Sequence, residues 1–271
     1  MKTIPVPVLF LLLSIMGVVS LSPVDSSAES IKPKLIVATS ASMPPMEMID
    51  QEGAVAGFDV DIIRAVAKEA DFHVEIIPHA WKDLFSGLEQ GTFDAVISTV
   101  TITEKRRERF DFSVPYVTIG QVLVIPSEMN NAQGLAGMEG MKVGAVEGSL
   151  GAYEVKRSSG IQLKDYDEIG HAFQDMATGR IQGVVCDYIT AADLISGNDI
   201  YMERFRIAGP PFTRQECGIA VRKGNTGVLD MINRGVLAIQ SKGIAEQLET
   251  RWFKPPPASD SDKELYLPEQ R

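Results

Sequence analysis

Short runs of apolar residues alternate along this chain with segments in which apolar residues recur every three or four positions. The runs predict buried strands, and the recurring positions predict helices that bury one face. Because the two patterns alternate from Lys34 onward, the chain is expected to adopt an α/β fold. The predicted strands are 35–38, 74–77, 95–97, 142–146 and 217–221, and the predicted helices include 59–70, 152–156, 189–194 and 228–248, with Asp59 as the cap of the first.

Part of this pattern occurs twice. Residues 85–97 are echoed by residues 173–185, at an offset of 88 residues. Each copy has the pattern of a helix with an apolar face, a glycine placed to end that helix (Gly91 or Gly179), and a buried strand. The echo predicts a duplicated structure with two lobes.

Polar side chains follow both of the duplicated strands. Ser98, Thr99 and Thr101 come after the first strand, Arg106 follows a few residues later, and Asp187 ends the second strand. Ligands of open α/β sheets bind beyond the carboxyl ends of the strands. Arginine can hold a carboxylate through two parallel hydrogen bonds, and aspartate can pair with an ammonium group. The pattern therefore predicts a site for a zwitterion.

Two further segments can contribute to such a site. Residues 147–151, with Glu147, Ser149 and Gly151, form a turn into a predicted helix, whose first N–H groups favour an anion. Trp81 precedes the first duplicated helix and can lay its ring over a ligand.

Each of these features also has a purely structural interpretation. Arg106 lies in the charged run 104–107, which is typical of a solvated helix face. Thr101 and Thr103 can be ordinary strand residues or a helix cap, Asp187 can cap the following helix, and Trp81 can belong to the core. The residues alone leave both interpretations open.

Composition narrows the range of partners. The 271 residues are 45% hydrophobic and 23% charged, which is enough for a sizeable core, and the formal net charge is −10. Nucleic acids and anionic membranes require clustered Lys and Arg, so a small molecule or a protein is the expected partner.

The N-terminus is expected to be an export signal. Lys2 precedes an apolar stretch from Ile4 to Leu21, and 26–28 offers a small-residue cleavage site, so residues 1–28 are predicted to be a signal peptide. The alternative is an uncleaved membrane anchor. The proline-containing segment 254–271 is predicted to be an extended or disordered tail, and whether Cys186 and Cys217 form a disulfide stays open.

Several motifs together resemble a known family. These motifs are residues 57–62 (Gly-Phe-Asp-Val-Asp-Ile), 101–106 followed by 111–113, 218–220 and the closing 252–253, with Pro45 and Glu47. Together they resemble motifs of the extracellular solute-binding proteins that deliver amino acids to ABC importers. This group includes glutamine-, histidine- and lysine/arginine/ornithine-binding proteins. The resemblance extends from about Leu35 to Phe253.

The resemblance implies the type II periplasmic binding protein fold, in which two Rossmann-like α/β lobes are joined by two crossing strands. Lobe 1 would comprise residues 34–116 with 217–253, and lobe 2 would comprise 117–216. Arg106 and Thr101 look like the clamp for the ligand α-carboxylate, and Asp187 looks like the partner of its α-ammonium group. Thr99 and Ser98 would add contacts, Trp81 would be the aromatic wall, and the turn at 147–151 would complete the carboxylate seat.

Departures from the family pattern fall where the ligand side chain would be chosen. Ser40 stands where relatives commonly carry an acid, Met43 where an aromatic residue is usual, and Leu150 where threonine is frequent. An acidic Glu147 near the pocket would suit a cationic ligand, whereas Met43 and Met46 favour an apolar or adaptable pocket. The sequence leaves these two chemistries open.

The function predicted from the resemblance is binding of an amino acid between two closing lobes, by an exported monomer that serves a membrane ABC permease and uses no cofactor or metal. An enzyme similar to cyclohexadienyl dehydratase is the first alternative, with Glu147 or Asp187 as its general acid. A sensing domain tethered by an uncleaved N-terminal anchor is the second. His73, His79 and His171 lack metal-ligand spacing, and the sequence has neither a Gly-x-Ser-x-Gly elbow nor a phosphate-binding Gly-Lys-Ser/Thr loop.

Overall fold

The structure is a computed structural model that describes Met1 and residues 32–129 and 134–253. The predicted signal peptide, apart from Met1, and the predicted tail lie outside the described residues. Within the described ranges, no helix is both long enough and apolar enough to cross a membrane.

The first of two large sheets forms lobe 1 and has the strand order β5-β1-β6-β15-β7. β5, β1 and β6 are parallel to one another, and β15 is antiparallel to both of its neighbours. The strands are β1 (Lys34–Thr39), β5 (His73–Pro78), β6 (Ala95–Val96), β7 (Phe110–Phe112) and β15 (Ala220–Arg222). The helices of lobe 1 are α1 (Phe58–Glu69), α2 (Trp81–Gln90), α3 (Glu104–Arg107), α8 (Thr226–Ser241) and α9 (Ile244–Trp252).

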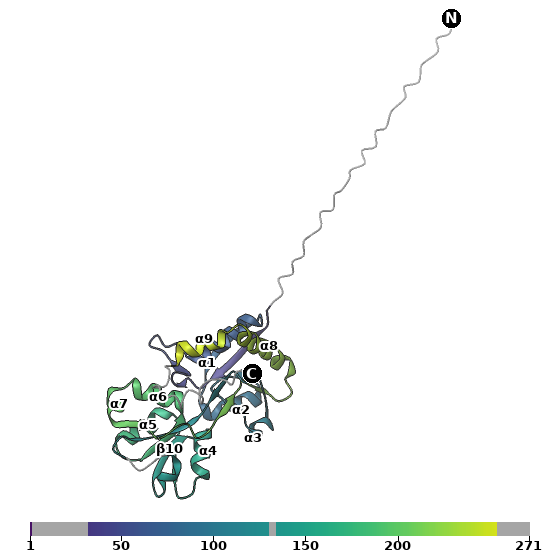
Figure 1. The fold of residues 1–271 in the computed structure, drawn as a ribbon. Coiled ribbons are helices and arrows are strands. Elements are labelled where there is room, and N and C mark those ends of the chain that lie inside the picture. The colour runs from purple at the N-terminus through teal and green to yellow at the C-terminus, as the bar shows by residue number, and fades with distance from the viewer. Residues whose placement is uncertain (2–31, 130–133, 254–271) are drawn as a thin grey trace. The chain divides into compact units, whose positions relative to one another are not determined.

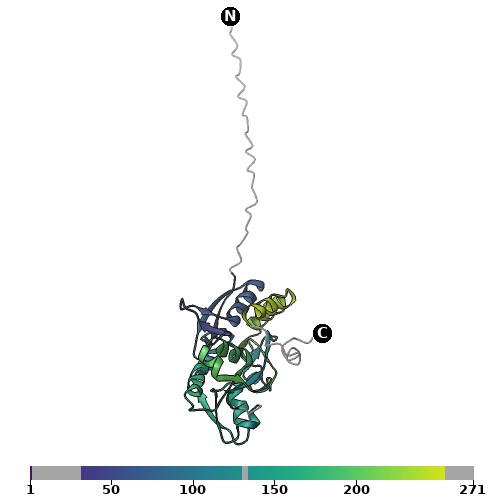
Figure 2. The same cartoon turned by 60° about the vertical axis from the view of Figure 1, so that its left-hand side comes forward.

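Helices cover both faces of this sheet. In β1, Leu35 and Val37 point into the core shared with α1 and α8, whereas Ile36 and Ala38 point into the core shared with α2. α1, α8 and α9 lie side by side (Figures 1 and 2). The sheet is therefore buried on both sides, which explains the nearly continuous apolar runs of its strands.

The second large sheet forms lobe 2 and has the order β11-β10-β12-β9-β13. β11, β10 and β12 are parallel to one another, and β9 is antiparallel to both of its neighbours. The strands are β9 (Gln121–Pro126), β10 (Lys142–Val146), β11 (Gln162–Tyr166), β12 (Gly183–Asp187) and β13 (Phe205–Ile207). The helices are the 3-10 helix η1 (Leu135–Met138), α4 (Leu150–Arg157), α5 (Ile169–Ala177), α6 (Tyr188–Ser196) and α7 (Asp199–Arg204).

Lobe 2 is layered in the same way. Val184 and Cys186 of β12 face the core formed with α5 and α6, and Val185 faces the core formed with α4. Together the two lobes confirm the predicted α/β class.

Two antiparallel strands connect the lobes. They are β8 (Val117–Ile119) and β14 (Gln215–Cys217), which pair as a separate two-stranded sheet. A small sheet in lobe 1 comprises β2 (Ser42–Met43), β3 (Glu47–Ile49) and β4 (Val55–Ala56). The paired crossing strands are those implied by the resemblance.

Two sequence expectations need correction. The helix predicted at 228–248 is two helices, because Gly243 adopts a left-handed φ of 68° between α8 and α9. The strand predicted at 217–221 is divided between β14, which begins at Gln215, and β15.

Candidate functional site

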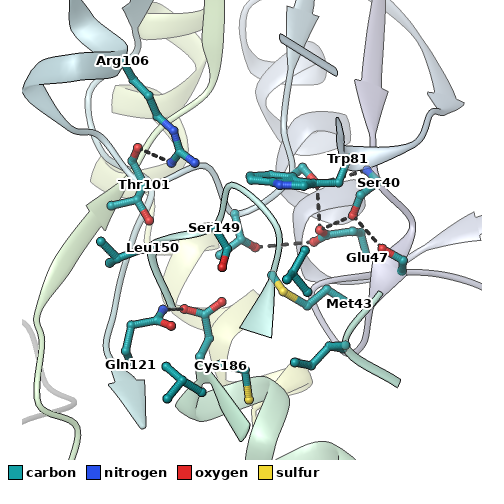
Figure 3. A pocket seen from close by; sticks show the side chains of 17 residues that line it. Ser40, Met43, Glu47, Trp81, Thr101, Arg106, Gln121, Ser149, Leu150 and Cys186 are labelled. Atoms are coloured by element: carbon teal, nitrogen blue, oxygen red, sulfur yellow. Dashed lines mark hydrogen bonds between the residues drawn. The ribbon is translucent and has the colours of Figure 1, made fainter. Parts of the chain in front are cut away.

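A pocket lies between the carboxyl ends of β6 and β12 and draws its walls from both lobes (Figure 3). Nine of the eleven predicted site residues line it, namely Ser40, Met43, Trp81, Ser98, Thr99, Thr101, Arg106, Ser149 and Asp187. Glu147 and Gly151 do not line it. The remaining lining residues are Ser42, Glu47, Gln121, Val146, Leu150, Ile169, Val185 and Cys186.

Arg106 is held by carbonyl oxygens and aromatic rings. Its Nη1 donates to the Thr101 carbonyl at 2.8 Å, and its Nη2 donates to the Gly148 carbonyl of lobe 2 at 3.4 Å. The guanidinium carbon lies 5.6 Å from the Trp81 ring centroid and 5.1 Å from that of Phe85. Burial lowers the pKa of Arg106 to about 10, so the group stays charged at neutral pH. Arg106 thus differs from Arg107, which is exposed.

α3 places this arginine. Thr103 is the N-cap, and its hydroxyl accepts a hydrogen bond from the Arg106 N–H at 3.2 Å. Thr103 is therefore a helix cap, which is one of the two structural interpretations that the sequence left open for it. Arg106 is nevertheless half-buried.

Trp81 connects the two lobes. Its indole Nε1 donates to the carbonyl oxygen of Glu147 at 3.0 Å, and its ring meets Phe85 edge-on. The Glu147 side chain itself is exposed. Glu147 thus contributes its backbone to the contact between lobes, and its carboxylate stays outside the pocket.

The backbone of Thr99 is in an unusual conformation. Its φ is 48°, in the left-handed region that β-branched residues rarely adopt. The Asp59 carboxylate accepts hydrogen bonds from the Thr99 N–H at 2.6 Å and from its hydroxyl at 3.1 Å. Asp59 therefore does not cap α1 as predicted: the N-cap is Gly57, and the Asp59 side chain turns inward to hold the pocket wall.

Gly57 allows two acidic side chains, Glu47 and Asp59, to lie behind the part of the pocket wall that Thr99 forms. A Cβ at Gly57 would fall 2.3 Å from the Met46 carbonyl oxygen, so only glycine allows the β3 segment to approach α1 this closely. The Asp59 N–H donates to that carbonyl at 2.9 Å. This packing places Glu47 beside Asp59, and both side chains are fully buried.

The two acids form a coupled pair. Burial raises the pKa of Glu47 well above its usual range, and the charge of Asp59 raises it further. Burial also raises the pKa of Asp59, to about 6, although hydrogen bonds from Tyr116 and Thr99 oppose the rise. Because two adjacent buried carboxyls disfavour double ionisation, the pair favours a single negative charge, and the larger rise in the pKa of Glu47 favours placing that charge on Asp59.

Asp187 provides the negative charge of lobe 2. It ends β12 directly opposite Gln121 of β9, whose amide donates to the Asp187 carboxylate. Asp187 occupies the N-cap position of α6 but makes no side-chain capping bond. Burial raises its pKa to about 7, so a ligand cation at this position would favour its ionised form.

The N-terminus of α4 closes the lobe 2 side of the pocket. Ser149 caps this helix by accepting from the Ala152 N–H at 3.1 Å. Gly151 of α4 lies against β9 and β12, where a Cβ would fall 2.9 Å from the Gln121 amide oxygen and 3.0 Å from the Val185 carbonyl. Gly151 thus allows α4 to pack closely against the strands that carry the site.

Cys186 and Cys217 are both buried free thiols. Cys217 lies on a crossing strand, where its Sγ–H donates to the Thr99 carbonyl at 3.4 Å, and Cys186 lines the pocket. Burial raises the pKa of both thiols well above their usual range, so neither is a reactive thiolate at neutral pH. Among the described residues, no group of His, Cys, Asp and Glu is arranged to hold a metal ion.

The prediction of site residues overlooked some members of the pocket. Gln121 is recognisable from the sequence as a candidate, because it is the polar first residue of an otherwise apolar strand. Glu47 appeared only as part of a motif, because nothing in the local pattern indicates that its carboxyl reaches Ser98. Ile169 and Val185 have the pattern of ordinary core residues, and their place at the pocket follows only from the fold.

Comparisons with known proteins identify the family of this chain. The profile of the family described as "Bacterial extracellular solute-binding proteins, family 3" matches residues 35–255. The L-cystine-binding protein TcyJ of Escherichia coli (strain K12) is 29% identical over 221 residues, covering 81% of this chain and 82% of that protein. A probable histidine-binding protein of Neisseria gonorrhoeae is 31% identical over 236 residues, covering 84% and 87% respectively.

A solved structure is also similar. An ancestral arginine-binding protein bound to arginine superposes with a TM-score of 0.78 at 33% sequence identity, covering 83% of this chain and all of that one. The chain therefore belongs to family 3 of the bacterial extracellular solute-binding proteins, and it has the type II fold of periplasmic amino-acid-binding proteins. The relatives named here are binding proteins.

Proposed function

We propose that this protein is the substrate-binding component of an amino-acid ABC importer, exported under the direction of residues 1–28 and acting as a monomer. The observation that carries the proposal is that one pocket between the lobes combines the positive charge of Arg106 from lobe 1 with the negative charge of Asp187 from lobe 2. This arrangement matches the two charged ends of an α-amino acid.

Arg106 would bind the ligand carboxylate. In the described structure two of its five N–H groups donate to backbone carbonyls, which leaves the others for an incoming carboxylate. Thr101 and the turn that leads into α4 adjoin the same guanidinium. Asp187 would pair with the ammonium group, and Trp81 would cover the ligand from lobe 1.

Binding of this kind would favour lobe closure, because a ligand that contacts both lobes stabilises the state in which both contacts exist. Trp81 and Arg106 already donate to carbonyls of the β10–α4 turn, so closure would join ligand contacts to direct contacts between the lobes. The membrane permease would then recognise the closed form.

The test is calorimetry with the mature protein and a panel that includes cystine, histidine, arginine, glutamine and prephenate. Arg106→Ala is expected to weaken the binding of the preferred amino acid by about 100-fold or more, because it removes a charged donor from a partly buried site. Arg107→Ala is the matched control, since its side chain is exposed one position away. Unchanged affinity in Arg106→Ala would contradict the clamp, and turnover of prephenate would favour the enzyme alternative.

A further inference from the structure

One end of the pocket lies away from Arg106 and is formed by Ser40, Met43 and Glu47 (Figure 3). If Arg106 and Asp187 hold the charged groups of an amino acid, the ligand side chain extends toward this end. The groups found there therefore decide which side chains are accepted.

The carboxyl at this end is fully engaged with hydroxyls of the protein. Glu47 Oε1 accepts hydrogen bonds from Ser40 at 3.0 Å and from Ser98 at 2.8 Å, and Oε2 is reached by the Thr99 hydroxyl at 3.4 Å. Ser42 in turn donates to the Ser40 oxygen at 3.2 Å. The carboxyl therefore lines this end of the pocket with its oxygens already occupied by hydroxyl donors.

Glu47 is also a poor source of negative charge. It is hydrogen-bonded to the buried Asp59, and burial together with that charge raises the pKa of Glu47 well above its usual range. The charge of the pair is favoured on Asp59, where hydrogen bonds from Thr99 and Tyr116 stabilise it. A ligand cation at this end would meet a carboxyl whose oxygens are already hydrogen-bonded and whose ionisation is opposed by burial.

No other carboxylate of the described residues lines this end. Asp187 is bound by Gln121 and faces the proposed ammonium position, and the Glu147 side chain is exposed outside the pocket. The remaining side chains around the ligand space are largely apolar: Met43, Val146, Leu150, Ile169, Val185 and Cys186.

We propose that this pocket selects α-amino acids with uncharged, largely apolar side chains and discriminates against lysine and arginine. The inference rests on the proposed function and names its substrate class. Moving a side-chain cation into such a pocket removes its hydration without providing an anionic partner, which is strongly unfavourable. Met43 supplies an adaptable apolar contact that suits side chains of different shapes.

The first experiment is a calorimetric comparison of methionine, leucine, glutamine, glutamate, arginine and lysine on the unmodified mature protein. At least one of the uncharged amino acids is expected to bind about tenfold or more tightly than arginine or lysine. Arginine or lysine binding as tightly as the best uncharged ligand would overturn the inference while leaving the proposed function intact. Binding of none of these amino acids, and of neither cystine nor histidine, would overturn the proposed function, and the inference with it.

A pair of variants tests the role assigned to Glu47. Because the Glu47 carboxyl is buried and already accepts from three hydroxyls, Glu47→Gln is expected to lower the affinity for arginine and lysine no more than about threefold beyond any loss of affinity for uncharged amino acids. Glu147→Gln is the matched control, since it makes the same chemical substitution at an exposed position outside the pocket. A selective loss of arginine or lysine binding in either variant would identify that residue as a counter-ion and overturn the proposal.

Discussion

The duplicated segments of the two lobes are alike in their scaffold and different at their ends. α2 begins at Trp81 and α5 at Ile169, which is the offset of 88 residues found in the sequence. Gly91 and Gly179 follow these helices with the same left-handed φ of 75°. β6 and β12 each occupy the central position of a five-stranded sheet.

The strand ends carry opposite chemistry. Lobe 1 continues from β6 into the hydroxyls of Ser98, Thr99 and Thr101, whereas β12 of lobe 2 ends in the carboxylate of Asp187. A common scaffold therefore presents donors on one side of the pocket and an acceptor on the other. This asymmetry is what fits the site to a ligand with two unlike ends.

The support behind the two ends differs as well. The lobe 1 end depends on the strained Thr99 backbone, which two buried acids, Glu47 and Asp59, hold in place. The lobe 2 end depends on a regular strand and one amide, that of Gln121. Ligand binding should therefore be more sensitive to substitution of the buried residues that support the lobe 1 side of the pocket than to substitution of those that support the lobe 2 side.

Asp59→Asn should have the largest effect, because an amide cannot accept from the Thr99 N–H, the Thr99 hydroxyl and Tyr116 as the carboxylate does. Loss of these bonds would release the strained backbone. The variant is expected to lose about 1–3 kcal/mol of folding stability and about tenfold in ligand affinity. Denaturant unfolding and calorimetry measure the two effects.

Asp83→Asn serves as the control for Asp59→Asn, since it removes an equal charge from an exposed position in the first turn of α2. It should change neither quantity appreciably. Equal ligand affinity in the parent and Asp59→Asn proteins would show that the Thr99 geometry does not depend on its acidic support.

The pH dependence of ligand binding should report the ionisation of Asp187, at the lobe 2 side of the pocket. Because burial raises the pKa of Asp187 to about 7 and a ligand ammonium favours the ionised carboxylate, binding should release protons below neutrality. Affinity is expected to rise about tenfold between pH 6 and pH 8 and then to level off. Asp59, with a pKa of about 6, and Glu47, whose pKa is raised well above its usual range, are the other acids near the pocket.

Calorimetry at pH 6 in buffers of different ionisation enthalpy measures the released protons. Asp187→Asn keeps the shape of the side chain and should abolish most of the release while lowering affinity at pH 8. A parent protein that binds equally well at pH 6 and pH 8 without proton release would exclude Asp187 as the ammonium partner.

The sequence predicted the repeated scaffold because local patterns encode it: apolar periodicity defines the helices, and a glycine ends each one. It also predicted most of the pocket, since polar residues directly after buried strands are conspicuous. It could not predict the inward turn of Asp59, because a carboxylate near a helix start is equally suited to capping. The inward position depends on the close approach of the β3 segment that Gly57 permits, a packing contact that no local apolar periodicity reports.

The position of Glu147 illustrates the same limit. An acid in the turn before a helix lies near the site in sequence, but the direction of its side chain follows from the backbone of the turn. The structure directs its carbonyl to Trp81 and leaves its carboxylate exposed. Local sequence places the turn correctly and leaves the direction of each side chain undetermined.

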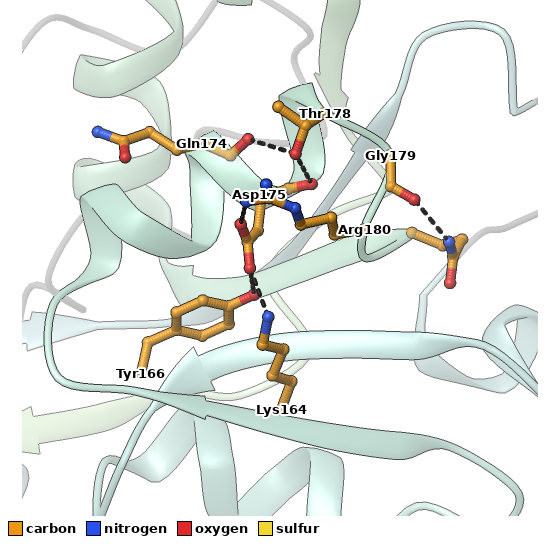
Figure 4. A network of polar contacts seen from close by, with 8 residues as sticks. Lys164, Tyr166, Gln174, Asp175, Thr178, Gly179 and Arg180 are labelled. Atoms are coloured by element: carbon orange, nitrogen blue, oxygen red, sulfur yellow. Dashed lines mark hydrogen bonds and ion pairs between the residues drawn. The ribbon is translucent and has the colours of Figure 1, made fainter.

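One of the positions at which the duplicated helices differ predicts the smallest effect. Gly87 of α2 lies against Phe93, where a Cβ would fall 2.6 Å from the ring. Its counterpart in α5 is Asp175, which binds Lys164, Tyr166 and Arg180 (Figure 4). These hydrogen bonds lower the pKa of Asp175, so its contribution to stability is present at neutral pH and is lost only in strong acid.

Asp175→Asn is therefore expected to lower the unfolding midpoint slightly at pH 7, because it weakens the tie between α5 and β11. Ligand affinity should not change, since none of the four residues of this network lines the pocket. Glu75→Gln in lobe 1 is the comparison, because it breaks the single exposed ion pair with Lys34, 2.7 Å long, and should have a smaller effect than loss of the network. Weaker ligand binding in Asp175→Asn would show that the scaffold and the site of lobe 2 are coupled, which the separate support of Asp187 by Gln121 argues against.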